Sequence, residues 1–165
     1  MTPITLEAAK KIATLFTNNS AIEVEVNSIA TGSSYIVPVI PVSQVYLSST
    51  PVNMADMQQQ LGYPRLSVFC SRFVNQHREK FRSLSGTLAI TVEIAVTADL
   101  VDLVENWMHY YVEAVSNILR KSAGDLGDGV FFPGTYQVDV QLAQAGGSGF
   151  LQLAQVTCEL GVSRN

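Results

Sequence analysis

Two cysteines and two histidines supply the thiol and imidazole groups from which a nucleophilic site would be built. Neither His77 nor His109 sits in a Gly-x-Ser-x-Gly turn or belongs to a papain-like cysteine motif. Cys70 and His77 lie closest in sequence, but Cys70 shares the strand parity of the apolar residues around it and is expected in the core. Cys158 also lies in an apolar stretch, far from Cys70. We expect both thiols to be reduced core residues.

Acidic and glycine-rich segments offer no recognisable metal or phosphate site. The stretch Asp125-Leu-Gly-Asp128-Gly lacks the regular oxygen-ligand spacing of a calcium loop and is typical of a solvated turn. Gly146-Gly-Ser-Gly149 is not followed by a helix N-terminus that would hold a phosphate. The sequence therefore predicts no catalytic residues, no bound metal and no cofactor.

Positive charge is concentrated in one segment of this acidic chain. Half of the 10 lysines and arginines fall within eighteen residues, opposed there by Glu79 alone. One interpretation is an ordinary solvated hairpin tip; the other is a local contact with DNA phosphates in a lumen or with an acidic partner. The residues of this segment are Arg65, Arg72, Arg78, Lys80 and Arg82, and we assign the contact to the last four.

The N-terminal third predicts a helix followed by a strand and an irregular segment. Thr2 and Pro3 are typical of a helix start, and apolar residues then recur at helical spacing, which predicts a helix over residues 3–17. Apolar and acidic residues alternate over 22–26, which predicts a half-buried strand. Residues 33–64 hold four prolines and predict an irregular insertion. Within it, residues 35–42 are expected to form an edge strand or extended arm, and 54–61 one or two helical turns.

The middle of the chain predicts two strands, at 66–73 and 86–97. In the second, Leu88, Ile90 and Val92 point one way, while Thr87 and Thr91 point the other. One face is therefore expected in the core, and the other is small and weakly polar.

A long helix follows, over residues 99–122, with Asp99 as its predicted cap and cationic residues in its last turn. Its apolar positions form two adjacent stripes, one containing Met108 and the other Trp107. Since one stripe is enough to cover a sheet face, the second is either part of a central core helix or meets a neighbouring subunit.

The C-terminal part predicts a hairpin. Residues 136–142 alternate cleanly, residues 145–149 read as the turn, and 150–160 form the last strand. The apolar parity switches along this last strand, which predicts a bulge near residues 152–155.

Composition fits one folded domain. The 165 residues are 47% hydrophobic and 15% charged, which excludes intrinsic disorder for most of the chain. A net charge of −4 argues against coating of nucleic acid, and no apolar run is long enough to span a membrane. We predict a single α+β domain over 1–165, with one mainly antiparallel sheet packed against an N-terminal and a long central helix, plus an extended hairpin or arm.

Few charges on so small a domain suggest that part of its surface is buried against other copies. The residues predicted at a subunit interface come from the second helix stripe and from the arm: Leu103, Trp107, Tyr110, Tyr35, Ile36 and Val37.

The segment Tyr63-Pro-Arg-Leu-Ser-Val-Phe, the strand at 86–97 leading into the long helix, and the glycine-turned hairpin together resemble the tail terminator proteins of long-tailed bacteriophages. The resemblance covers the order of elements and the chain length. It implies a homohexameric ring in the phage neck, assembled in the host cytoplasm. Such a ring stops polymerisation of the tail tube and joins the tail to the head connector.

The resemblance also implies the partners of the chain: tail tube and sheath proteins, the head-tail connector, and genomic DNA passing non-specifically through the lumen. It implies a location in the virion and no membrane partner. Three alternatives stay open at this point. They are another neck, collar or tail-completion protein, a small-ligand-binding or enzymatic α+β domain, and a DNA-binding regulator.

Overall fold

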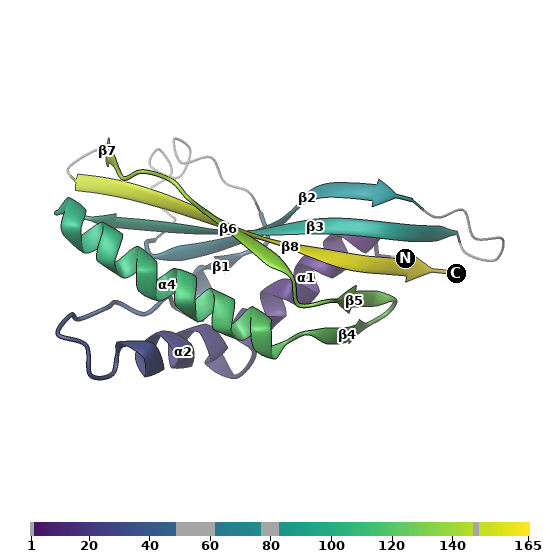
Figure 1. The fold of residues 1–165 in the computed structure, drawn as a ribbon, viewed down its shortest axis with the longest axis horizontal. Coiled ribbons are helices and arrows are strands. Elements are labelled where there is room, and N and C mark those ends of the chain that lie inside the picture. Colours follow the sequence, from purple (N-terminus) through teal and green to yellow (C-terminus); the bar gives the residue numbers. More distant parts are fainter. Residues whose placement is uncertain (1, 49–61, 77–82, 147–148) are drawn as a thin grey trace.

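A long twisted β-sheet with helices on one of its faces forms the framework of the molecule (Figure 1). The computed structural model describes residues 2–48, 62–76, 83–146 and 149–165. The fold is α+β, and its sheet is mainly antiparallel, as the sequence predicts.

The first helix, α1 (Ile4–Thr17), begins one residue later than predicted, with Pro3 at its N-cap. Ala8, Ile12 and Phe16 line its buried face at helical spacing. A 3-10 turn, η1 (Asn18–Ser20), then bends the chain into the next helix (Figure 1).

The prediction of a strand at 22–26 is wrong, because these residues form α2 (Ala21–Ala30). Ile22 and Val26 are four residues apart and both fully buried, so they occupy one helix face, while Val24 between them is 60% exposed. The apolar-acidic alternation fits both periods over five residues. The packing of α2 against the central helix decides between them.

Three strands form the centre of the sheet: β2 (Arg65–Asn75), β3 (Leu84–Ala98) and β8 (Gly149–Arg164). β3 pairs with β8 over the whole length of β3, without a register shift. Even-numbered residues of β3 from 88 to 96 face the helices and are buried, as predicted.

The predicted bulge at 152–155 is absent from β8, whose pairing with β3 is continuous. The apparent change of parity has another cause. Gln152 takes an inward position and is buried, and its side-chain N–H donates to the Gln141 carbonyl at 2.9 Å. Leu151 and Leu153 therefore lie on the opposite sheet face. A bulge does occur in β2, between Cys70 and Arg72.

Shorter strands flank this centre, in the order β1-β2-β3-β8-β5-β4, with β6 and β7 also on β8. β1 (Val45–Tyr46) pairs with β2 in parallel. β6 (Tyr136–Val140) and β7 (Gln144–Gly146) lie along β8 and form the predicted hairpin. The region expected to be a loop contains another hairpin, β4 (Gly124–Gly127) with β5 (Val130–Phe132).

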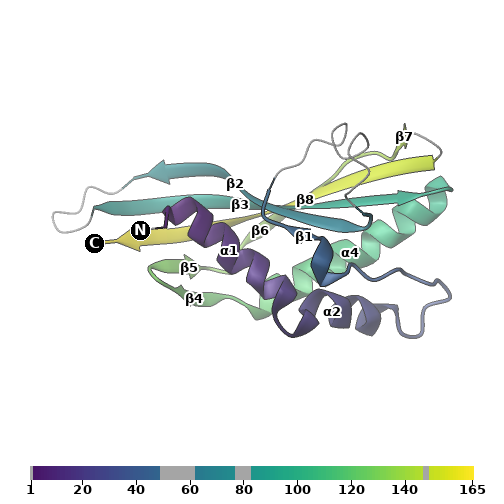
Figure 2. The ribbon, with the colours of Figure 1, turned by 180° about the vertical axis from the view of Figure 1, so that it is seen from behind.

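The long helix α4 (Val101–Lys121) runs along the same sheet face as α1 (Figures 1 and 2). Asp99 does not cap it, since Leu100 occupies the N-cap position and no side-chain cap is formed. Met108, Tyr111 and Val115 of the first stripe are buried against the sheet.

α2 and α4 are joined near their surface by one carboxylate. Glu25 accepts hydrogen bonds from Lys121 Nζ at 2.8 Å and from Asn117 Nδ2 at 2.9 Å. The hydrogen bond from Lys121 lowers the pKa of Glu25, and the Asn117 amide adds to this effect against the opposing influence of burial.

We expect Glu25→Gln to lower the free energy of unfolding at pH 7 by about 0.5–1 kcal/mol. The folded-state pKa of Glu25 lies below the unfolded value of about 4.3, so the contribution is present above that value and is lost as the pH falls through the folded-state pKa. Urea titrations at pH 7 and pH 3 measure both effects. A difference between variant and wild type that is as large at pH 3 as at pH 7 would contradict this account.

Candidate functional site

Three aromatic residues of α4 hold the extended segment that follows α2. The Trp107 indole N–H donates to the Ile36 carbonyl at 3.1 Å, and the Tyr111 hydroxyl donates to the Pro38 carbonyl at 2.5 Å. The Tyr110 and Ser33 hydroxyls lie 2.7 Å apart in a third hydrogen bond. The arm, residues 35–42, is therefore bound to the chain's own α4 through Trp107 of the second stripe and Tyr111 of the first.

This contact separates the predicted interface residues into groups. Val37 is 7% exposed and belongs to the core, whereas Tyr35 is 47% and Ile36 91% exposed. Leu103, Trp107 and Tyr110 are half-buried. Part of the second apolar stripe of α4 is thus covered by the chain's own arm. The arm in turn exposes the Ile36 side chain to solvent.

The three most exposed of the large apolar side chains in the described structure, Ile36, Leu142 and Leu100, belong to segments at one end of the molecule (Figures 1 and 2). Figures 1 and 2 place the start of α4, the β6–β7 connection and the segment after α2 at the same end of the long axis. We call this set the end patch: Ile36, Leu100, Val101, Val140 and Leu142. Ile36 at 91% and Leu142 at 86% are the most exposed members. Such a gathering is typical of a protein–protein contact.

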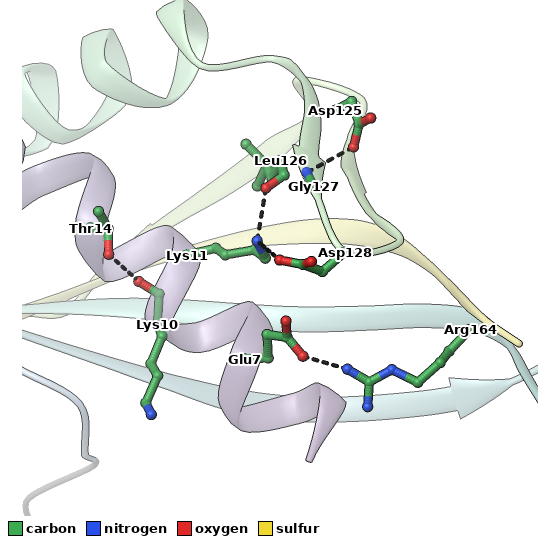
Figure 3. Close-up of polar contacts among 9 residues, drawn as sticks. All are labelled: Glu7, Lys10, Lys11, Thr14, Asp125, Leu126, Gly127, Asp128 and Arg164. Atoms are coloured by element: carbon green, nitrogen blue, oxygen red, sulfur yellow. Dashed lines mark hydrogen bonds and ion pairs between the residues drawn. The ribbon is translucent and has the colours of Figure 1, made fainter. Parts of the chain in front are cut away.

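At the other end, polar contacts fix the β4–β5 hairpin to α1 (Figure 3). Lys11 Nζ donates to Asp128 Oδ2 at 2.7 Å and to the Leu126 carbonyl at 2.9 Å, and Arg164 pairs with Glu7. The hydrogen bond from Lys11 lowers the pKa of Asp128. These charges are paired with each other, so the cluster has a structural role.

Of the four predicted basic contact residues, the structure describes only Arg72. Arg72 pairs with Glu159 at 2.6 Å, which offsets its charge, and Arg65 is fully buried. The other predicted contact residues, Arg78, Lys80 and Arg82, lie outside the described residues.

A polar hollow of about 590 Å³ lies on the sheet face opposite the helices, across β2, β3, β8 and β6. A row of hydroxyls crosses it, with Thr91 bonded to Ser71 at 3.0 Å and to Thr157 at 3.2 Å. The lining residues are Ser71, Arg72, Ala89, Thr135, Tyr136, Gln137, Asp139, Thr157 and Glu159. Within the described chain these three hydroxyls bond to one another and to a backbone carbonyl, and none of them bonds to a base that would activate it as a nucleophile.

The thiols are poorly suited to nucleophilic chemistry. Both cysteines are free; burial raises the pKa of Cys158 to about 12 and also raises the pKa of Cys70. A thiol with a raised pKa is rarely present as the reactive thiolate at neutral pH. Cys158 is buried as predicted, whereas Cys70 is only half-buried. His77, its suggested partner, lies outside the described residues.

No protein-family model matches this chain, and no curated protein matches its sequence. Within the described ranges, side chains suited to metal binding do not gather in a group of three or more. The described helices include none with the length and apolar character needed to cross a membrane.

Sequence reasoning missed that the two predicted interface elements bind each other. The signal was present, because three adjacent or near-adjacent aromatic residues with polar tips lie on α4 and need buried or bridging partners. The proline-broken arm, which has backbone carbonyls without strand partners, provides them. The row of hydroxyls depends on strand register and left no local pattern.

We expect Trp107→Phe to loosen the arm, because it removes the indole donor to the Ile36 carbonyl and keeps most of the ring. The loss of one such hydrogen bond costs about 0.5–1.5 kcal/mol of stability. Hydrogen exchange followed by mass spectrometry should show faster exchange in residues 33–38. The matched control is His109→Ala, at an exposed position on the same helix. Equal exchange in both variants would show that the indole does not hold the arm.

Proposed function

We propose that this protein is a structural component of a phage neck. It forms a homohexameric ring at the head-proximal end of the tail, where it ends growth of the tail tube and sheath and joins the tail to the head connector. Genomic DNA passes through its lumen without sequence-specific contact, and the protein acts in the virion without catalysis. The observation that carries the proposal is the end patch, together with the resemblance in the order of elements.

The exposed apolar surface favours association with other copies. Burying an isoleucine or leucine side chain contributes about 1.5–3 kcal/mol, and the end patch offers several such side chains to a partner.

Different surfaces at the two ends favour a head-to-tail contact. The β4–β5 hairpin lies toward the end opposite the end patch (Figure 1), and its Phe131 is 51% exposed. A contact between unlike surfaces generates a ring when the rotation between subunits closes. The held arm contributes Ile36 to this contact and gives it a fixed position.

A second candidate function is binding of a small polar molecule, favoured by the hollow on the open sheet face. Its volume of about 590 Å³ is in the range of ligand sites, and its walls offer hydroxyl, amide and carboxylate groups. Another neck or collar protein would use the same end patch and differs from the first proposal only in its partners.

The ring proposal predicts that Ile36→Asp and Leu142→Asp weaken assembly and leave folding unchanged, because both side chains are solvent-exposed in the subunit. Each substitution should raise the dissociation constant at least about tenfold, since 1.4 kcal/mol corresponds to a factor of ten. Mass photometry gives the subunit count, and circular dichroism gives the folded fraction.

The matched control is Val24→Asp, on α2, where an apolar side chain is 60% exposed and does not belong to the end patch. It should assemble like the wild type. A wild-type chain that stays monomeric at high concentration and is absent from virions would disprove the proposal. A monomer that binds polyols or other small polar molecules would favour the second candidate.

A further inference from the structure

Arg65 is the largest of the fully buried side chains in the described structure. It is the first residue of β2 and pairs with Ala95, which places it on the sheet face opposite the helices. None of its three guanidinium nitrogens has a hydrogen-bond partner in the described chain. Its guanidinium group makes a cation–π contact with the Tyr63 ring, whose centre lies 4.7 Å from the guanidinium carbon.

An arrangement of this kind requires a negative charge. Arginine keeps its charge in proteins, and a buried ion without a partner is strongly destabilising. The face of an aromatic ring offsets only part of that cost. Glu93 is the diagonal neighbour of Arg65 on the same sheet face. Its carboxylate accepts a hydrogen bond from the Gln155 side chain at 3.0 Å. The described ion pairs do not include Arg65.

A second unsatisfied group lies beside Arg65 in the sheet. Gln44 precedes Val45, and the parallel pairing of Val45 with Leu66 brings Gln44 level with Arg65. The side-chain oxygen of Gln44 is buried and has no partner within the described chain. A half-turn of the amide about its last bond places an N–H at the same position, where it can donate to an anion.

Gly62 leaves room for this amide. A Cβ at position 62 would lie 2.2 Å from the Gln44 side-chain nitrogen. Two buried polar groups without partners in the described chain, an aromatic ring and a glycine thus lie together where β1 and β2 begin.

We propose that this cluster is an anion site, in which Arg65 and Gln44 bind a small oxyanion, phosphate or a carboxylate, beside the Tyr63 ring. A guanidinium binds two oxygens of such an anion with parallel hydrogen bonds. The site lies apart from the end patch and does not depend on ring formation, so either proposal can fail without the other.

The test compares thermal unfolding of the chain refolded in sodium phosphate and in sodium chloride at equal ionic strength. At phosphate concentrations of about 100 times the dissociation constant, the melting temperature of the wild type should rise by about 5–10 °C and reach a plateau. Arg65→Met should lose the saturable rise. Arg120→Met, at an exposed arginine of α4 that belongs to none of the proposed sites, should keep it. An equal rise in wild type and Arg65→Met would overturn the proposal.

Two further measurements protect the test against variants that fail to fold. The first is equilibrium dialysis of the refolded wild type against labelled phosphate and, separately, against labelled acetate. At least one of these anions should bind with one anion per chain, and the comparison shows whether the site prefers phosphate or a carboxylate. The absence of binding for both would overturn the proposal.

Asp56, which lies outside the described residues, is the only acidic residue between Glu25 and Glu79. If the effects of Asp56→Asn and Arg65→Met on the melting temperature are not additive, the counter-charge belongs to the chain itself and the proposal is overturned.

Discussion

The pairing of β3 with β8 is the constraint on which the rest of the structure depends. It runs from Leu84 opposite Arg164 to Ala98 opposite Phe150 without interruption. Because side chains alternate along a strand, one fixed register decides for both strands which residues face the helices. β2 attaches to one side of this pair, β5, β6 and β7 attach to the other, and α1 and α4 pack on the apolar face.

A sheet with helices on one face leaves its other face to polar residues. Here that face bears the row of hydroxyls, the Arg72–Glu159 pair and a hollow lined by that pair and by two of the hydroxyl residues, Ser71 and Thr157. The buried guanidinium of Arg65 also lies on this face, where the local structure supplies an aromatic ring and no described hydrogen-bond acceptor. The apolar packing and the polar features are thus separated by the two faces of one sheet.

The contact between α4 and the arm links packing to the proposed assembly. Trp107 and Tyr111 use their polar tips to bind backbone carbonyls of a segment that has no strand partner of its own. Val37 enters the core while its neighbour Ile36 points to solvent. An apolar side chain held in this way loses little conformational freedom on binding, which is an advantage for an interface residue.

Local pattern was sufficient for several elements. The strict alternation around Leu88 to Val96 determined the central strand, and the helical spacing of α1 and α4 determined two helices, because in each case one period fits the apolar residues over many positions. The α+β class and the final hairpin followed from the order of these elements. The sequence also indicated apolar surface in excess of what one small core needs.

Tertiary structure decided the rest. Residues 22–26 fit both periods, and only packing against α4 made them helical; the position of Gln152 depended on a carbonyl eleven residues away. Trp107 and Tyr110 were predicted to contact a neighbouring subunit. In the structure they bind Ile36 and Ser33 of the same chain, about 70 residues earlier in the sequence. A pattern along the chain records which side chains need partners, whereas the identity of each partner depends on how distant segments come together.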